Sequence, residues 1–223
     1  NLTIAVVILI VLGFAYFFFI ISPQEHQAAS SGYNSALDAS AAKQIELPPP
    51  FDPAVDHFEG NPAAKNVFVE YADFQCPACA VFSNILKEVP SKFNDTVFVY
   101  RHFPLVQIHK NTVQAALAAE AAGAQGKFWE MHDVLFAKQA EWDKMGDPLD
   151  AFAQYAQSVG VDNIDQFKAD VVNKKYLAAV EKNNNEALGL SLPGTPSMFF
   201  NGHSLKSADL AGLEKQAQEF YKK

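Results

Sequence analysis

The sequence has very little cysteine. Only two cysteines occur among 223 residues, and both fall in the segment Cys76-Pro77-Ala78-Cys79. No other cysteine is left for a structural disulfide, and a zinc site of four thiolates is excluded. Any cysteine chemistry of this chain must therefore take place within this one pair.

An excess of basic residues is also absent. Lys and Arg number 17 against 25 Asp and Glu, which gives a formal net charge of −8. Proteins that bind DNA or RNA usually carry a basic patch, so we expect no nucleic-acid partner. The chain has no internal repeat, and its length suits one ordinary domain with one hydrophobic core.

Charge is missing altogether from the N-terminal run Leu2 to Ile21. A helix of about twenty residues spans a hydrocarbon core of roughly 30 Å. A cleaved signal peptide usually has a shorter apolar region of ~7–15 residues. No cysteine follows the run, which excludes a lipoprotein anchor. We therefore expect residues 1–21 to be an uncleaved transmembrane helix, with a cleaved signal peptide as the alternative.

The segment after this run carries no positive charge. Ser22-Pro23-Gln24-Glu25 contains no Lys or Arg. By the positive-inside rule, the rest of the chain should lie outside the cytoplasm. We expect a membrane-anchored protein whose folded domain lies in the periplasm or at the outer face of the cytoplasmic membrane. Such an oxidising compartment allows a cysteine pair to cycle as a disulfide.

The composition changes after the N-terminal region. Residues 22–60 are rich in Ala, Ser, Gln and Pro and predict a polar linker, stiffened at Pro48-Pro49-Pro50. The folded domain is expected over residues 61–223. Its first strand is predicted at residues 67–71, directly before the cysteine motif.

A helix and a second strand are predicted after the motif. Val81, Phe82 and Leu86 have helical spacing and are expected on the buried face of a helix that Pro90 ends. Residues 96–103 have the composition of a second strand. The order strand, cysteine motif, helix and strand predicts an α/β fold.

A helical insertion is expected over about residues 109–190. Strand signals return at residues 197–200, before the turn pair Asn201-Gly202. A final helix is predicted up to Phe220, with Ser207 as its N-cap. The expected order is therefore β–α–β, an all-helical insertion, and β–β–α.

The position of the cysteine motif favours redox chemistry. Cys76 falls at the start of the predicted helix, where unpaired N–H groups and the helix dipole stabilise a thiolate. Cys76 is expected to be the exposed member that attacks a partner, and Cys79 the buried member that resolves the mixed disulfide. A buried, unreactive pair and a metal clip are the alternatives. None of the six histidines forms a tight cluster with the motif, so we expect no metal and no cofactor.

Gly194-Thr195-Pro196 is the second candidate element of the site. A proline directly before a central strand is unusual. A cis Thr195–Pro196 bond could present the Thr195 backbone to an extended substrate and remove an N–H near the reactive sulfur. An ordinary trans turn proline is the alternative.

At this point the sequence resembles the DsbA-like branch of the thioredoxin superfamily. The resemblance runs from about residue 61 to the C-terminus. It rests on four stretches in the right order: Val69-Glu70-Tyr71-Ala72-Asp73-Phe74-Gln75-Cys76-Pro77-Ala78-Cys79, Tyr100-Arg101-His102-Phe103-Pro104-Leu105, Gly126-Lys127-Phe128-Trp129-Glu130-Met131-His132, and Gly194-Thr195-Pro196-Ser197-Met198-Phe199-Phe200-Asn201-Gly202. The resemblance implies a thioredoxin-like fold with an inserted helical subdomain and a cis proline facing the cysteine pair. It also implies thiol oxidation in exported proteins.

The resemblance implies roles for two further residues, Glu70 and Ala78. Glu70 matches the position of a buried acid that can exchange a proton with Cys79, unless it faces solvent at a strand end. Ala78 stands where strongly oxidising members have His. The side chain of Ala cannot donate a hydrogen bond or a positive charge to the Cys76 thiolate, so we expect a higher Cys76 pKa and a less oxidising pair than in those members. Asp73 is expected to form a turn, and His102 to be a structural residue at a strand end.

Three functions remain open from the sequence. The first is an oxidase that donates its disulfide to reduced exported proteins and is recharged by a quinone-linked membrane partner, which only the resemblance implies. The second is an extracytoplasmic disulfide reductase or isomerase, although residues 22–60 look too polar for a dimerisation domain. The third is a non-catalytic module that binds or delivers a metal through the two thiolates.

Overall fold

A five-stranded mixed sheet forms the centre of the molecule. The computed structural model describes residues 46–88, 93–206 and 210–221. The strands lie in the order β1-β3-β2-β4-β5. Their bounds are β1 (His57–Glu59), β2 (Asn66–Ala72), β3 (Thr96–His102), β4 (Ser197–Phe200) and β5 (His203–Leu205). Strands β2 and β3 are parallel, and the other three neighbouring pairs are antiparallel.

Alternating side chains of the central strands fill the two faces of the sheet. Because side chains of a strand point to opposite faces with a period of two, Phe68 and Val69 belong to different cores. On one face, the ring of Phe68 lies 5.9 Å from that of Phe98 and 6.3 Å from that of Phe200. This aromatic row joins three adjacent strands.

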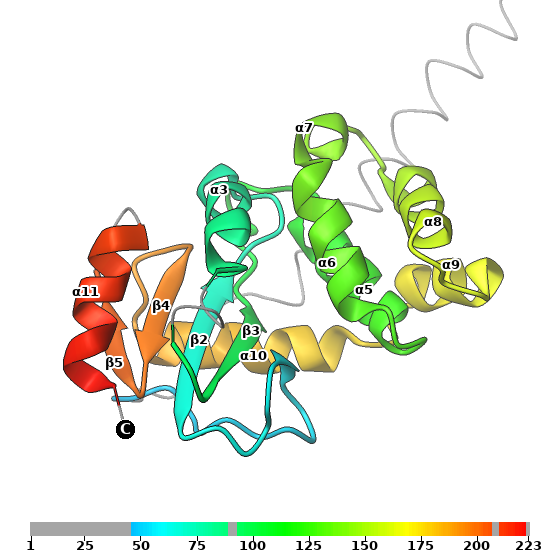
Figure 1. Ribbon diagram of the computed structural model, residues 1–223. Coiled ribbons are helices and arrows are strands. Elements are labelled where there is room, and N and C mark those ends of the chain that lie inside the picture. The colour runs from blue at the N-terminus through cyan, green and yellow to red at the C-terminus, as the bar shows by residue number, and fades with distance from the viewer. Residues whose placement is uncertain (1–45, 89–92, 207–209, 222–223) are drawn as a thin grey trace, which may run out of the picture.

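Helices cover both faces of the sheet (Figure 1). Helices α3 (Pro77–Leu86) and α11 (Leu210–Phe220) contribute Phe82, Leu86, Leu213 and Ala217 to the core that contains Phe68. Helix α10 (Leu177–Gly189) contributes Ala187 to the core on the opposite face. The sheet is thus the middle of three layers.

The predicted helical insertion lies beside the sheet (Figure 1). It consists of α5 (Thr112–Gly123), α6 (Phe128–Ala137), α7 (Gln139–Trp142), α8 (Leu149–Ser158) and α9 (Ile164–Val172), and it ends with α10. Helix α5 is its centre, because every residue from 112 to 122 is buried. Alanines make up much of α5, and their small side chains let neighbouring helices pack closely on all sides.

The folded part begins earlier than residue 61, inside the segment that we expected to be linker. Strand β1 pairs with β3. The preceding segment is held by Arg101, whose Nε donates to Asp56 Oδ1 at 2.9 Å and whose Nη1 donates to Pro49 O at 3.1 Å. A three-residue edge strand has too short a pattern to be predicted from its own sequence.

The buried face of α3 differs from the expected one. Val81 is 61% exposed, whereas Cys79, Phe82, Ser83 and Leu86 are buried. Because the helix begins at Pro77, the buried stripe passes through Cys79 and leaves Val81 on the outer side. Residues Pro90 and Ser207 lie outside the described ranges.

The expected transmembrane helix over residues 1–21 also lies outside the described ranges. Among the residues that are described, none of the helices combines the length and the apolar character that a membrane span requires.

The Arg101–Asp56 pair gives a stability prediction. Both side chains are almost fully buried, at 2% and 3% exposure. Replacing Arg101 with Gln leaves the Asp56 carboxylate buried without its partner, so we expect the free energy of unfolding to fall by about 3–5 kcal/mol. Urea denaturation measures this loss. The matched control is Lys168→Gln, which breaks an exposed pair with Asp150 and should cost no more than about 1 kcal/mol. Equal losses in the two variants would contradict the prediction.

Candidate active site

The cysteine pair lies where β2 ends and α3 begins. The Cys76 N–H donates to Asp73 O at 3.0 Å, which turns the chain after the strand. Cys76 has an extended backbone, with φ −75° and ψ 121°, and Pro77 is the first residue of the helix. Proline suits this position because the first helical N–H groups have no partner within the helix. The helix start at Cys76 is thus confirmed.

The two sulfurs differ in burial. Cys79 is fully buried, whereas Cys76 keeps 7% exposure. Cys76 is therefore less exposed than we expected, although it is the only member of the pair that reaches the surface. The loop before β4 covers it, because Cys76 Sγ donates to Thr195 O at 3.4 Å.

The surroundings give the two thiols opposite acidities. A hydrogen bond from Cys79 is the largest cause that lowers the pKa of Cys76, to about 5; burial opposes it, and Thr195 and the N–H groups of Cys79 and Ala78 add to it. Burial is the main cause that raises the pKa of Cys79 well above 9. The pair therefore holds one thiolate and one thiol at neutral pH, with the charge on Cys76.

The Thr195–Pro196 bond is cis, as the resemblance implied. The bond lies next to Cys76 through the Thr195 carbonyl. The Thr195 hydroxyl is buried and has no hydrogen-bond partner among the described residues. It can donate to the sulfur once Cys76 ionises, which is one reason why the Cys76 pKa is low.

This donor gives a prediction for Thr195→Val. The variant keeps the shape of the side chain and loses the hydroxyl, so the Cys76 pKa should rise by roughly one to two pH units, because a hydrogen bond to a charged group is worth about 1.5–3 kcal/mol. The ultraviolet absorbance of the thiolate, followed against pH, measures the change. The control is Thr96→Val, at the opposite end of the sheet, where no change is expected. An unchanged titration in Thr195→Val would count against a role for this hydroxyl.

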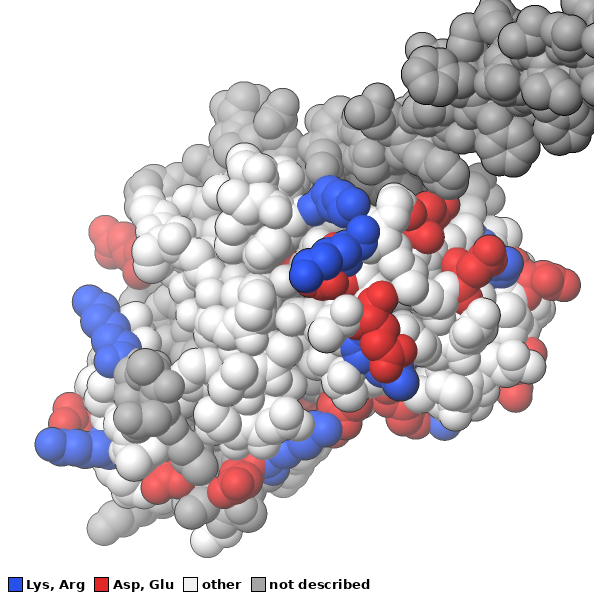
Figure 2. Space-filling model, turned by 90° about the horizontal axis from the view of Figure 1, so that it is seen from above, with Lys and Arg blue, Asp and Glu red and all other residues white. Residues whose placement is uncertain are grey.

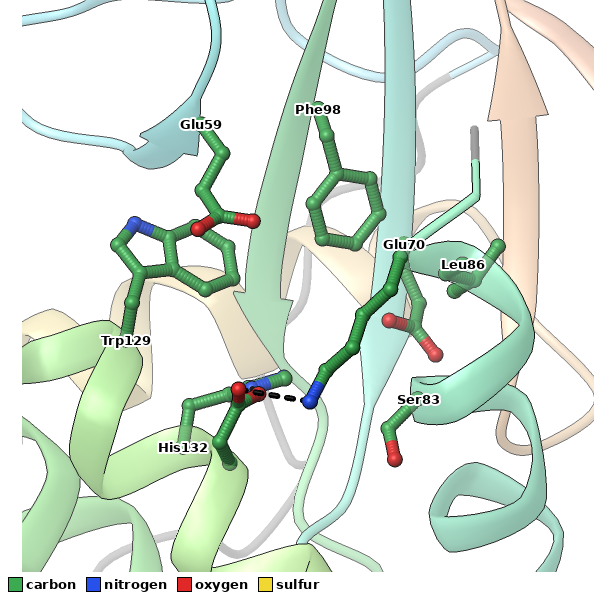
Figure 3. Close-up of a pocket in the computed structure, with 9 residues that line it drawn as sticks. Glu59, Glu70, Ser83, Leu86, Phe98, Trp129 and His132 are labelled. Carbon is green, nitrogen blue, oxygen red and sulfur yellow. Dashed lines mark hydrogen bonds and ion pairs between the residues drawn. The ribbon is translucent and has the colours of Figure 1, made fainter. Parts of the chain in front are cut away.

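Glu70 is buried rather than turned toward solvent. It is 1% exposed, and its Oε1 atom has no hydrogen-bond partner within the described part of the chain. Burial is the main cause that raises its pKa to about 8, and the charge of Cys76 adds to it. The carboxyl group points into a narrow pocket, on the side of Ser83, and the Lys87–Asp133 ion pair lies in the same pocket (Figure 3). Glu70 therefore holds a proton at neutral pH.

Asp73 does more than form the expected turn. Its Oδ1 accepts hydrogen bonds from Gln75 N and Thr112 Oγ1, and its Oδ2 lies 2.9 Å from Leu105 N and 2.7 Å from His109 Nδ1. The buried Asp73 side chain thus links the loop of residues 73–76, called the cysteine loop below, to the loop after β3 and to α5. The sequence did not predict His109 for this role.

Gln139 is a second residue that the sequence analysis missed. Its Nε2 donates to Phe74 O at 2.8 Å and to Cys76 O at 2.9 Å. More than sixty residues separate it from the motif, so no local pattern could have revealed it. His102 does not reach the cysteine pair, because its Nε2 lies 2.9 Å from Glu120 Oε1.

The face on which α3 begins carries a broad uncharged area. Figure 2 shows this face from above, with Lys, Arg, Asp and Glu gathered around an area that lacks them. Exposed apolar side chains near the cysteine loop include Val81 and Ile108, which are 61% and 73% exposed. Ile108 directly precedes His109, the partner of Asp73.

Solved structures of known proteins have the same fold. BdbD from Bacillus subtilis has a TM-score of 0.69 at 23% identity, over 80% of this chain and 98% of that one. α-DsbA1 from Wolbachia pipientis has a TM-score of 0.65 at 19% identity, over 77% and 92%. MdbA from Corynebacterium diphtheriae, a thiol-disulfide oxidoreductase, has a TM-score of 0.61 at 19% identity, over 81% and 97%. At these identities the likeness shows the fold.

Curated relatives match only with a part of their length. The chain is 40% identical over 163 residues to a protein named Na(+)/H(+) antiporter NhaA 1 of Mycolicibacterium gilvum, which covers 71% of this chain and 25% of the antiporter. A protein of the same name from Mycobacterium sp. strain KMS is 40% identical over 175 residues, or 76% and 27%. The chain thus spans about a quarter of the length of these relatives.

A family described as Thioredoxin matches residues 54–219, which is most of the chain. This match includes β1, both cysteines and Pro196. Together with the sheet order and the cis proline, it means that the chain belongs to the thioredoxin family and has the DsbA-like form of its fold, with an inserted helical subdomain.

Proposed function

We propose that this chain is a thiol:disulfide oxidoreductase that forms disulfides in exported proteins. One observation carries the proposal: a surface-reaching sulfur with a pKa near 5 is paired with a buried thiol of raised pKa, beside the carbonyl of Thr195. A thiolate of low pKa is a good leaving group, which favours passing a disulfide on to a substrate.

The exchange proceeds in two displacements. A substrate thiolate attacks Cys76 Sγ of the Cys76–Cys79 disulfide, a mixed disulfide forms, and the Cys79 sulfur leaves with the electron pair. Glu70 can protonate Cys79, because it holds a proton at neutral pH. A second substrate thiolate then attacks the substrate sulfur, and Cys76 leaves as a thiolate. The substrate has lost two electrons and gained a disulfide, and the enzyme pair is reduced.

The chemistry at Cys76 suggests a moderate oxidant. The Cys76 pKa of about 5 lies between roughly 7 in thioredoxin and roughly 3.5 in DsbA. Ala78 offers no side-chain donor where strongly oxidising relatives have His. Cys79, Thr195 and the N–H groups at the helix start stabilise the thiolate instead, so we expect a potential below that of the His-containing members.

The setting of the reaction is part of the same proposal. An N-terminal membrane helix would hold the domain outside the cytoplasm, in the periplasm or at the outer face of the cytoplasmic membrane. It would also raise the effective concentration of a quinone-linked membrane oxidase that reoxidises the pair. The uncharged area on the face where α3 begins suits an extended peptide chain of a reduced substrate (Figure 2). The exposed apolar side chains of Val81 and Ile108 add to this preference.

Two refolding reactions and one titration test the proposal. The oxidised protein should form disulfides in a reduced substrate with several cysteines, and Cys76→Ser should not. Its potential against glutathione should lie well above the cytosolic poise. A potential near that of thioredoxin would instead indicate a reductase, and faster repair of a scrambled substrate would indicate an isomerase. Tight, stoichiometric metal on the reduced pair with no exchange would indicate a metal-delivery module.

A further inference from the structure

Three side chains with metal-binding atoms converge away from the cysteine pair. They are His57 on β1, His102 at the end of β3, and Glu120 on α5. Glu120 Oε1 lies 2.8 Å from His57 Nε2 and 2.9 Å from His102 Nε2, and all three atoms lie within 4.8 Å of one another. The proposed thiol exchange uses none of these groups.

Packing holds the two imidazole rings in place. The His57 ring stacks on Phe128 with centroids 3.4 Å apart and planes 5° from parallel. The His102 ring is buried and meets Tyr100 edge-on at 5.2 Å. Because neither ring can turn freely, both Nε2 atoms stay directed at the same carboxylate oxygen. Because the two rings are already ordered, little side-chain conformational entropy is lost when a ligand binds.

The kind of ligand atoms selects the class of metal. Two imidazole nitrogens and one carboxylate oxygen are the ligands of zinc-type sites, whereas calcium and magnesium prefer oxygen ligands alone. Ligand bonds of about 2.0–2.2 Å place the ligand atoms of a tetrahedral ion roughly 3.3 Å apart. The two Nε2–Oε1 distances of 2.8 and 2.9 Å need to open by a few tenths of an ångström, and the two Nε2 atoms, which lie within 4.8 Å of each other, need to reach the same spacing.

The cluster also has an open side. The side chain of His57 is 25% exposed, whereas those of His102 and Glu120 are 1% and 11% exposed. An ion can therefore enter past His57 and keep a fourth position for water. Its charge would be partly balanced by the Glu120 carboxylate in a region otherwise lined by aromatic rings.

We propose that His57, His102 and Glu120 form a binding site for a zinc-class divalent transition metal. The ion would bind the Nε2 lone pairs of both rings and Oε1 of Glu120, with each ring carrying its proton on Nδ1. It would join the edge strand β1 to its neighbour β3 and to the insertion helix α5 (Figure 1), and His57 on β1 lies 63 residues from Glu120 on α5 in the sequence. Since the ligands meet only in the folded chain, the ion would stabilise the native state.

Zinc titration of the oxidised full chain, without an affinity tag, tests this site. Oxidation ties both cysteines in a disulfide, so thiolates cannot contribute and the result does not depend on the proposed exchange. We expect one equivalent of Zn²⁺ per chain in calorimetry. Replacing His57 with Gln should weaken zinc binding at least about tenfold. Loss of a residue that only hydrogen-bonds to a metal ligand already lowers metal affinity ~10–100-fold.

Two further measurements distinguish loss of the metal site from misfolding of the variant. His203→Gln removes an exposed histidine that stacks on Phe220 and should leave the affinity unchanged. Co²⁺ added to the oxidised wild type should give the intense visible absorption of tetrahedral nitrogen and oxygen ligation, a result that needs no variant. Absence of zinc binding to the oxidised wild type, or equal affinity in His57→Gln, would overturn the proposal.

Discussion

The Cys79→Ala variant is expected to stop thiol exchange after its first step. Cys76 keeps its place at the start of α3 and can still attack a disulfide, but the only other thiol of the chain is gone. The mixed disulfide on Cys76 should therefore accumulate, and turnover should fall below detection. Mass spectrometry of the protein mixed with a peptide disulfide measures the trapped adduct.

Cys79→Ser is the matched control for Cys79→Ala. Loss of Cys79 removes the largest cause of the low Cys76 pKa, so this pKa should rise in Cys79→Ala. A serine hydroxyl can still donate to the Cys76 thiolate, so the rise should be smaller in Cys79→Ser, while the adduct persists in both. Normal turnover by either variant would show that Cys79 does not resolve the intermediate.

Glu70→Gln is expected to make the reduced protein more stable at alkaline pH. The folded-state pKa of Glu70, about 8, lies above the ordinary value of 4.5 because the carboxyl group is buried. Between these two values the folded chain binds more protons than the unfolded chain, so wild-type stability falls as the pH rises. This loss amounts to about 1 kcal/mol at pH 5 and about 4 kcal/mol at pH 8, and Gln avoids it.

Urea denaturation at the two pH values measures this difference. The advantage of Glu70→Gln over wild type should grow by about 3 kcal/mol from pH 5 to pH 8. Glu59→Gln is the control, because Glu59 lines the same pocket but is exposed, and it should show a much smaller change. An advantage that does not depend on pH would mean that Glu70 is not protonated in the folded state.

Glu70→Gln should also slow the release or uptake of the Cys79 proton. General acid–base catalysis typically contributes ~10²–10⁴-fold, so the exchange step that frees Cys79 should slow by a factor in this range. Stopped-flow measurement of reduction by a small thiol, followed against pH, separates this effect from the gain in stability. Wild-type rates and an unchanged pH profile would remove Glu70 from the mechanism.

Local sequence patterns predicted the elements that carry their own signals. The strand before Cys76, the start of the helix at Pro77 and the hairpin at Asn201-Gly202 each depend on neighbouring residues, and the structure has all three. Strand β1 gave no such signal, because its three residues form a strand only when β3 offers hydrogen bonds. Val81 was misplaced because a helix of ten residues has few turns to define its buried face.

Neither the contacts that hold the cysteine motif nor the cluster of His57, His102 and Glu120 could be predicted in the same way. Asp73 and His109 are 36 residues apart, and His57 and Glu120 are 63 residues apart. Each of these contacts exists only because the insertion packs against the end of the sheet. Histidines and carboxylates are common in loops and helices, so their types alone do not show which of them meet.

The sequence by itself determined that the chemistry lies in one cysteine pair, because no other cysteine exists and a spacing of two residues brings both sulfurs within a single helical turn. The place of Cys76 at the helix start already favoured it as the thiolate, but only the tertiary structure decided how far the acidities of the two sulfurs differ. Thr195, 119 residues from Cys76 along the chain, covers and stabilises the first sulfur, while Cys79 and Glu70 lose their contact with water. Desolvation is a property of the whole packed interior, and therefore no short segment of the chain specifies it.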